Sequence, residues 1–497
     1  MYSVVQQVKH LTRQLKAAPA AFAPALLLCA WSPFSAAATE TQTDWQAAAR
    51  QDLAFAAQTI QRQHIGYVAG HPNVVIPYQD GLALAESTLQ RVKTQQDYRR
   101  LLSRFVQGFG DPHLGIDLQL QTTGWSGLVI SKVKDQYQVV WSEPDWPTPL
   151  PAIGAVLHSC DGVWIGSYLK NVVAPFSAHA AEYAQSARVH AQSLMFERGL
   201  NTVPKVCEFS DNSPQRRRYS LTLQPVPAKV SQTRISEVRQ QFQARAKAVD
   251  VHALSPNRYW VGMPSFEVQD EGKAYRAMYQ KLAGLKQAEL IVFDLRGNGG
   301  GASSWGTEAI AALFGQDYAA QVEQYGGSAK SMIADQPTIQ LLRDYAANPA
   351  FASFKAEMNA AADKLTQAQQ AGEKTGLVSG SNNLSLPATT ATQPAGPRLA
   401  ALIDHHCFSS CMNFLQQLKA IPDTVVLGES TLGYSPYGEI MPVALPGGRA
   451  TLYVPTAFFT VKEAAREPFV PDHAYPGDLR DDAAIGKWID QVIPRSR

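Results

Sequence analysis

The sequence predicts an α/β protein with a parallel-rich sheet, preceded by a β-rich region and a helical region. Residues 45–109 carry apolar side chains at the spacing of helix faces, and from residue 114 the apolar period changes to two. Between residues 258 and 460, short apolar runs alternate with helical patterns, which is typical of βαβ units. The length of 497 residues is enough for two to four domains.

Composition excludes one large class of partners. Hydrophobic residues make up 45% of the chain, which is ample for real cores. The formal net charge is only +2, and no long run of like charge occurs. Because nucleic acid binding depends on a basic excess that neutralises phosphates, we expect no nucleic acid partner.

The first residues have the organisation of a secretory signal peptide. Lys9, Arg13 and Lys16 precede the apolar stretch AAPAAFAPALLLCAW, which is followed by the small-residue segment SPFSAAATE. We expect cleavage near Ala38, and hence an exported protein that is periplasmic or secreted. The alternative, a membrane anchor, is weakened because the apolar stretch contains two prolines and is shorter than the roughly 20 residues of a spanning helix. No stable membrane insertion is expected after cleavage.

Removal of the signal peptide with Cys29 leaves four cysteines, which persist as disulfides in an oxidising compartment. Four cysteines allow three pairings. We favour Cys160 with Cys207 and Cys407 with Cys411, because each pair falls within one region of the chain. Two disulfides would leave no catalytic thiol.

The elements follow in order along the chain. Helical patterns occupy 53–63 and 97–109, with turn residues between them at Gly70 and Pro72. Alternating patterns at 114–121, 127–133, 136–141 and 218–226 predict short strands, and 151–173 reads as a strand, an Asp-Gly turn and a short helix. In the last part, 258–266 and 450–460 read as strands and 271–285 as a helix, and the continuous apolar run at 288–295 is typical of a buried parallel strand. Further strands are predicted at 398–404 and 424–428, a helix at 409–421, and a helical insertion ending in a loop at about 315–397.

Two predicted strand ends carry polar residues, and ligands gather at the carboxyl ends of parallel strands. The first is FDLRGNGGGASSW at 293–305, where glycines let backbone N–H groups approach a ligand. A tight strand-to-helix turn explains it equally well, and neither the dinucleotide nor the P-loop spacing is present.

The second end is DHHCFSSCMNF at 404–414, which places Ser409 and Ser410 at a helix start. Free N–H groups and the helix dipole there suit an oxyanion. A serine at this position is also a common helix N-cap, so the residues alone leave both interpretations open.

Three motifs in order resemble the C-terminal processing (tail-specific) peptidase family of serine proteases, whose relatives include the tricorn core. The first, LIVFDLRGNGGG, matches at Asp294, Arg296, Asn298 and Gly300; the second puts Ser409 at the nucleophile position; the third, GESTLGY, matches at Gly428, Glu429, Thr431 and Gly433. The resemblance covers somewhat under half of the chain and implies a ClpP/crotonase-like peptidase core. More loosely, residues 127–173 look like the PDZ-type domain of many members, with a substrate-binding segment at Gly127, Leu128, Val129 and Ile130 that would capture an extended chain end.

The sequence also departs from the family pattern. The family's usual lysine base is replaced by Tyr434, and the glutamate three residues after the nucleophile is replaced by Met412. A serine without a base is a poor nucleophile, so another base must serve or the protein is inactive.

The tricorn-like branch implies a histidine base, and a histidine titrates near working pH. His113 in GFGDPHLGI takes that role by resemblance, with His405 and His406 as rivals close to Ser409. The resemblance places the third group, which orients the imidazole, at Glu467, with Glu439 as competitor. Backbone N–H groups of Ser410 and of Gly299 or Gly300 would form the oxyanion hole.

We therefore predict an exported serine endopeptidase that cleaves polypeptides by acyl transfer, without cofactor or metal. The alternative is a non-catalytic peptide- or ligand-binding protein on the same scaffold, and a metallohydrolase is disfavoured because no His-Glu-x-x-His pattern occurs. The predicted organisation is a signal peptide at 1–38, a helical domain at 39–121, a PDZ-like domain at 122–228 and a peptidase domain at 229–497.

Overall fold

The computed structural model describes residues 43–120, 122–179, 185–211, 215–225, 233–234, 236–237, 240, 243–244, 246–267, 272–326, 329–349, 354–379, 395–460 and 468–495. The predicted signal peptide lies outside these residues. Among them, no helix is both long enough and apolar enough to cross a membrane.

A helical segment opens the described chain. Its helices are α2 (Trp45–Gln63), α3 (Ile65–Val68), α4 (Pro72–Thr88), the 3-10 helix η1 (Leu89–Arg91) and α5 (Gln95–Gln107). Local signals set their starts: Asp44 accepts the N–H of Ala47 at α2, and Thr94 and Asp97 form a capping box at α5. The predicted helical spacing is confirmed here.

A β-rich segment follows, with a six-stranded sheet in the order β3-β4-β5-β8-β9 and β6 paired to β5. The strands of this sheet are β3 (Leu128–Val133), β4 (Gln136–Ser142), β5 (Val156–Cys160), β6 (Val163–Trp164), β8 (Val206–Ser210) and β9 (Arg216–Ser220). A smaller sheet of the segment has the order β10-β2-β7, formed by β2 (Gly124–Trp125), β7 (Phe196–Glu197) and β10 (Gln224–Pro225). Its helices are α6 (Ile165–Tyr168), the π-helix η2 (Leu169–Val173), the 3-10 helix η3 (Ala174–Phe176) and α7 (Ser186–Ser193). The run at 218–226, predicted as one strand, falls in two, β9 and β10.

The predicted disulfide of this segment is present. Cys160 and Cys207 face each other on the neighbouring antiparallel strands β5 and β8, with Cα atoms 4.1 Å apart. Both residues are fully buried in the segment's core.

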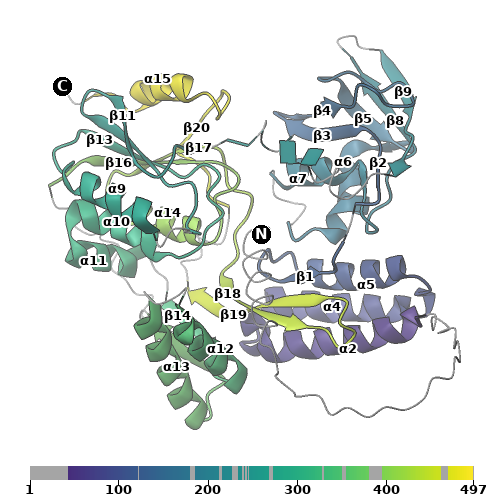
Figure 1. The fold of residues 1–497 in the computed structure, drawn as a ribbon, viewed down its shortest axis with the longest axis horizontal. Coiled ribbons are helices and arrows are strands. Elements are labelled where there is room, and N and C mark those ends of the chain that lie inside the picture. Colours follow the sequence, from purple (N-terminus) through teal and green to yellow (C-terminus); the bar gives the residue numbers. More distant parts are fainter. Residues whose placement is uncertain are drawn as a thin grey trace, which may run out of the picture.

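The core sheet has the order β11-β12-β13-β16-β17-β20 and is parallel apart from its β11–β12 edge. Its strands are β11 (Val251–Ser255), β12 (Arg258–Gly262), β13 (Leu290–Asp294), β16 (Arg398–Ile403), β17 (Val425–Gly428) and β20 (His473–Ala474). Helices α9 (Lys273–Ala283), α10 (Ser304–Phe314), α11 (Gln316–Gly326), α14 (Ser410–Ala420) and α15 (Asp482–Val492) accompany it (Figure 1). The predicted parallel-rich sheet is confirmed.

Both faces of this sheet are covered, which explains why its strands read as continuous apolar runs. On β13, Ile291 and Phe293 pack with residues of α9, α10 and α14, whereas Leu290 and Val292 pack with α15. Successive side chains of a strand point to opposite faces, so one run of five buried residues serves two layers. The carboxyl ends of β13 and β16 are adjacent, since Asp294 lies opposite Leu402.

A second, antiparallel sheet was not expected from the sequence. It joins β1 (Gly115–Asp117), β14 (Ala329–Ile333), β15 (Thr375–Ser379), β18 (Tyr437–Ala444) and β19 (Thr451–Thr460) in the order β1-β19-β14-β15, with β18 beside β19. The predicted strand at 450–460 therefore belongs to this sheet rather than to the parallel one. The insertion at 315–397 contains α12 (Gln336–Ala347) and α13 (Lys355–Gln370) but also β14 and β15, so it is not wholly helical.

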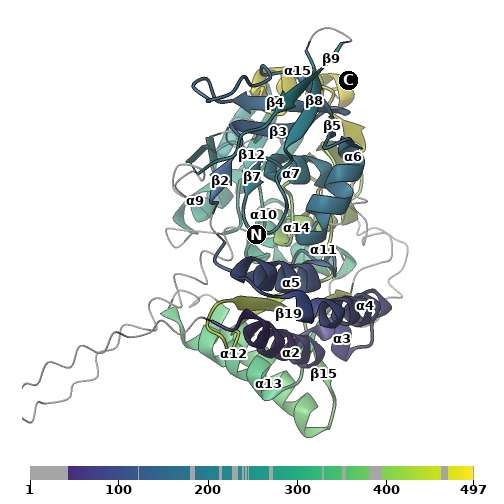
Figure 2. The same ribbon diagram turned by 90° about the vertical axis from the view of Figure 1, so that its right-hand side faces the viewer.

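This antiparallel sheet connects the parts of the molecule. Strand β1, just after the helical segment, pairs with β19 at Gly115 opposite Tyr453. Side chains of β18 and β19 join the hydrophobic core of the helical segment, and β19 lies against α2 in Figure 2. The helical segment is thereby fixed to strands β18 and β19, which lie between β17 and β20 of the core in the sequence.

Candidate active site

Ser409 lies where the loop after β16 enters α14. Its backbone angles are φ 56° and ψ −124°, in a region that residues other than glycine rarely adopt. Although it occupies the N-cap position, its side chain makes no capping hydrogen bond. The capping interpretation is therefore not met, and strained backbone of this kind is typical of functional positions.

The neighbouring serine is used structurally. The Ser410 hydroxyl donates to the carbonyl of Gly301 at 2.6 Å and accepts from the Ser303 hydroxyl at 3.1 Å. Its hydroxyl is thus engaged on both sides, whereas the Ser409 side chain makes no capping hydrogen bond in the described part of the chain.

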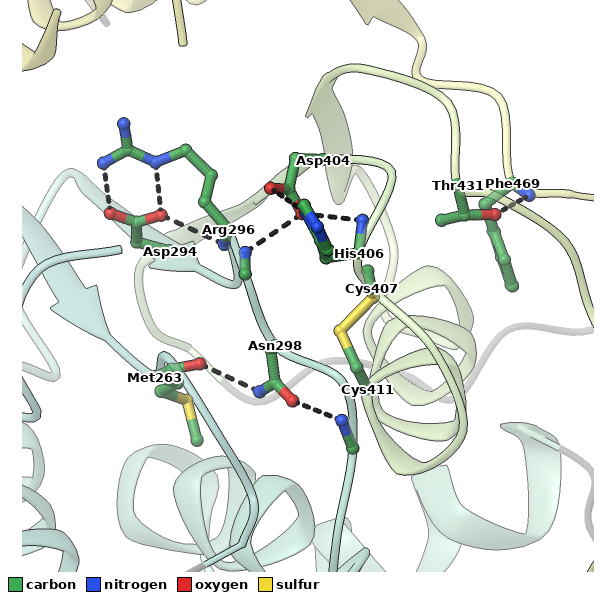
Figure 3. Close-up of a disulfide and its surroundings, with 12 residues drawn as sticks. Met263, Asp294, Arg296, Asn298, Asp404, His406, Cys407, Cys411, Thr431 and Phe469 are labelled. Carbon is green, nitrogen blue, oxygen red and sulfur yellow. Dashed lines mark hydrogen bonds and ion pairs between the residues drawn. A yellow bond between two sulfur atoms is a disulfide. The ribbon is translucent and has the colours of Figure 1, made fainter. Parts of the chain in front are cut away.

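The glycine loop after β13 is held by three side chains (Figure 3). Asp294 and Arg296, both buried, form a forked ion pair with contacts of 2.6 and 2.8 Å. The Asn298 amide donates to the Met263 carbonyl at 2.9 Å, and its oxygen accepts the Gly300 N–H at 2.9 Å. The family-like residues of this motif therefore shape the loop.

The loop approaches the helix start so closely that only glycine fits. A Cβ on Gly300, at φ 99°, would lie 2.8 Å from the Ser409 Cβ and 3.0 Å from the Ser410 nitrogen. Since the Gly300 N–H already donates to Asn298, Gly299 is the better of the two predicted oxyanion donors from this loop. Backbone donors of the loop and of the helix start thus lie together.

The loop before Ser409 is fixed by Asp404 and a disulfide. The fully buried Asp404 carboxylate accepts the Gly297 N–H and the His406 N–H, each at 3.0 Å. Burial alone would raise its pKa, but His406 and these bonds lower the pKa to about 2. Cys407 and Cys411 form the second predicted disulfide, which Figure 3 shows. Ser409 lies between these two cysteines in the sequence.

The two rival histidines are engaged elsewhere. His406 Nδ1 lies 3.2 Å from Asp404, and His405 Nδ1 lies 3.0 Å from Glu429 and 2.9 Å from Arg188. Asp404, His405 and His406 offer three potential metal-ligand atoms within 4.8 Å of one another. The Arg188 guanidinium beside His405 opposes a cation there, and the hydrogen bonds account for the cluster.

His113 precedes Ser409 by almost three hundred residues in the sequence, yet it lies close to the start of α14 in the fold. Its ring centroid is 4.7 Å from that of Phe408, the residue before Ser409. The residue is 8% exposed, and its Nδ1 has no hydrogen-bond partner among the described residues. Burial lowers its pKa and outweighs the opposing effects of Asp111, the Tyr437 backbone and Glu439. A neutral imidazole at neutral pH is the form that a general base requires.

The predicted third group is not placed. Glu467 lies outside the described residues, two positions before Phe469, whose N–H donates to the Thr431 hydroxyl at 2.9 Å. The competitor Glu439 acts electrostatically on His113, but its carboxylate pairs with Lys330 at 3.0 Å. That ion pair, more than any other effect, lowers the Glu439 pKa.

The two departures from the family pattern are buried. Tyr434 and Met412 both belong to the hydrophobic core of the parallel sheet. Each therefore has a packing role where the family has a charged residue.

The predicted substrate-binding residues lie at a sheet edge. Gly127 precedes β3, whose Leu128, Val129 and Ile130 are buried, and β3 is a terminal strand of its sheet. Helix α7 lies beside it, with the Gln192 amide 3.4 Å from the Ser131 hydroxyl. The edge and the helix face one another, as Figure 1 shows.

Two groups of contacts were missed by sequence reasoning. Arg188 of α7 pairs with Glu429 at 2.8 Å, and His64 of the helical segment lies 3.5 Å from Asp111. Both connect residues distant in sequence, and no local pattern marks them. The available signals were the position of Asp111 two residues before His113 and the place of Glu429 within the third motif.

Comparison with known proteins follows this geometry. Residues 260–466 match the sequence model of peptidase family S41. No curated protein sequence matches the chain. The structure of mature CPAF complexed with lactacystin is similar at 13% identity over 90% of this chain and 98% of that chain, with a TM-score of 0.61. Mature CPAF alone aligns at 13% identity over 90% and 97%, with a TM-score of 0.60. The photosystem II D1 C-terminal processing protease aligns at 14% identity over 89% and 99%, with a TM-score of 0.34. At these identities the CPAF likeness shows a shared fold.

Proposed function

We propose, from the match of residues 260–466 to peptidase family S41, that the protein is an exported serine endopeptidase with Ser409 as nucleophile and His113 as base. One observation carries the proposal: Ser409 has a strained backbone, and its side chain makes no capping hydrogen bond, at the point where the glycine loop approaches the start of α14. Strand-to-helix turns of this kind expose nucleophilic serines.

The reaction is acyl transfer. The Ser409 oxygen attacks the scissile carbonyl carbon while His113 removes its proton, and the N–H groups of Ser410 and Gly299 stabilise the oxyanion. His113 then returns the proton to the leaving amine as the carbon–nitrogen bond breaks. Water, deprotonated by His113, attacks the acyl-enzyme ester and releases the acid and Ser409.

Glu467 orients the imidazole in this proposal, as the resemblance implies. The unpaired Nδ1 of His113 supports an acceptor supplied from beyond the described residues. The ion pair with Lys330 disfavours Glu439 for this task.

Two further features belong to the proposal. Export follows from the signal-like N-terminus and is supported by the two disulfides. The β-rich segment is proposed to act like a PDZ domain, because β3 is an edge strand beside α7 and can accept an added chain.

Cleavage of an unfolded protein by the mature chain tests the function, with Ser409→Ala and Ser410→Ala as a matched pair. Ser409→Ala should lose activity by several orders of magnitude, roughly the 10⁶-fold known for a serine protease nucleophile. Ser410→Ala keeps its backbone N–H and loses a hydroxyl already bonded to Gly301, so a much smaller loss is expected. Equal cleavage by Ser409→Ala and the wild type would refute the assignment.

The non-catalytic alternative rests on Tyr434 and Met412, which replace charged residues of the family pattern. A serine-reactive phosphonate separates the two functions. Labelling of Ser409 that is lost in His113→Ala supports the enzyme, whereas tight peptide binding without labelling supports the binder.

A further inference from the structure

The loop that presents His113 is closed around a buried carboxylate. Asp111 Oδ1 accepts the His113 N–H at 2.9 Å, and the Asp111 carbonyl accepts the Leu114 N–H at 3.1 Å. Pro112 lies between them and fixes its own φ. The Asp111 side chain, 7% exposed, thus sets the direction in which His113 leaves the backbone.

Asp111 is in turn held from the helical segment. His64, fully buried, accepts the Gly66 N–H at Nδ1 over 3.1 Å, so the ring proton is on Nε2. That Nε2 faces Asp111 Oδ2 at 3.5 Å. The start of α3 therefore selects the tautomer that points a donor at Asp111.

The carboxylate is kept ionised in spite of burial. Burial raises the pKa of Asp111, but the His64 ring at 3.5 Å, the charge of His113 and the Ser435 hydroxyl more than offset it and lower the pKa. Its negative charge raises the pKa of His113 in opposition to burial. The other charged group acting on His113 among the described residues is Glu439 of β18, which is paired with Lys330.

We propose that Asp111, fixed by His64, is the positioning residue of the catalytic base: it orients the His113 loop and stabilises the imidazolium formed during catalysis. This inference rests on the proposed function, because it takes His113 as the base. It also assigns a role to the helical segment, whose α3 start supplies His64. His64 and Asp111 act through His113 without touching the reacting atoms.

The test compares Asp111→Asn with Asp111→Glu and with His71→Gln. Asparagine keeps the oxygen that accepts the His113 N–H but removes the charge; glutamate keeps the charge. His71, which contacts the Tyr437 hydroxyl at 3.0 Å from the same segment, controls for general loosening of this interface. In Asp111→Asn the acid limb of kcat/KM should move down by about one pH unit and kcat should fall about tenfold. Asp111→Glu should keep the wild-type acid limb, and so should His71→Gln.

A second measurement is independent of turnover. In the Ser409→Ala background, NMR titration of the His113 ring, assigned by its loss in His113→Asn, should show a lower pKa when Asp111→Asn is added. Equal titration in both backgrounds, or an unmoved acid limb with activity falling only in proportion to the folded fraction, would overturn the inference. Undiminished cleavage by Ser409→Ala alone would instead refute the proposed function and leave this titration interpretable.

Discussion

At the scale of single residues, Ser409 and Ser410 are adjacent in the chain, and their hydrogen bonds and backbone angles distinguish them. Ser410 is bonded to Gly301 and Ser303, and Ser409 has neither a cap bond nor relaxed backbone angles. A residue kept in such a backbone conformation costs of the order of 1–3 kcal/mol of stability, which the surrounding loop must offset. We expect Ser409→Gly to be more stable than the wild type by part of that amount while losing activity. Urea unfolding of the two proteins measures this, and a less stable Ser409→Gly would contradict the strain.

His113 makes a second prediction at this scale, on the pH profile. Only the neutral imidazole can act as base, and burial lowers its pKa below the ordinary value of about 6.5. Activity should therefore rise with pH through a midpoint below 6.5 and stay on its plateau at neutral pH. Since Glu439 raises the His113 pKa, Glu439→Gln should move the midpoint lower still. A midpoint well above 6.5 would indicate another base.

The third member of the triad is decided by the matched pair Glu467→Gln and Glu439→Gln. If Glu467 orients His113, its substitution should reduce kcat by roughly 10²–10⁴ with little change in KM. Glu439→Gln should cost far less activity and mainly loosen the contact with Lys330. Reversal of these two effects would assign the role to Glu439.

At the scale of elements, the start of α14 is braced by its own disulfide. Cys407 and Cys411, both fully buried, enclose the strained turn, whereas the bond between Cys160 and Cys207 ties two strands of the β-rich sheet. Removing the first pair with Cys407→Ala/Cys411→Ala should lower kcat more than tenfold, because the turn can relax. Removing the second pair should lower Tm and leave the kcat of a short peptide nearly unchanged. Similar kcat losses in both double variants would show that the first disulfide has no special role in the turn.

The same scale shows what the sequence could predict. Strand β13 and helix α14 were predictable because a continuous apolar run and a helical period are local signals, and three motifs in order located Ser409. The antiparallel sheet was not, because β1 pairs with β19 more than three hundred residues later. The link between His64 and Asp111 was missed for the same reason: each residue is unremarkable locally, and only folding brings them together.

At the scale of the whole molecule, the β-rich segment meets the core through a polar contact. Arg188 and Gln185 at the start of α7 bind Glu429, which also contacts His405 a few residues before Ser409. The contact is partly buried, with about a fifth of the Arg188 and Glu429 side chains exposed. The Arg188–Glu429 contact therefore connects α7, which lies beside the proposed substrate-binding strand β3, with the loop that leads to the proposed nucleophile Ser409.

Histidines surround that contact, and their titration makes the last prediction. Burial first, then the charges of His190, His405 and His406, lower the pKa of His179 to about 4. Burial also lowers the pKa of His190 and of His405. These groups bind protons more readily when unfolded, so they stabilise the fold fully above about pH 6.5 and less as pH falls through the window down to about 4.

The free energy of unfolding should therefore drop between pH 7 and pH 4.5, and His179→Gln should flatten that dependence. His252→Gln, which changes a histidine bonded to the Ala248 carbonyl away from this contact, is the control. Urea unfolding at both pH values, in the disulfide-intact protein, gives the slopes. If His179→Gln and His252→Gln alter the slope equally, the acid sensitivity does not originate where the β-rich segment meets the core.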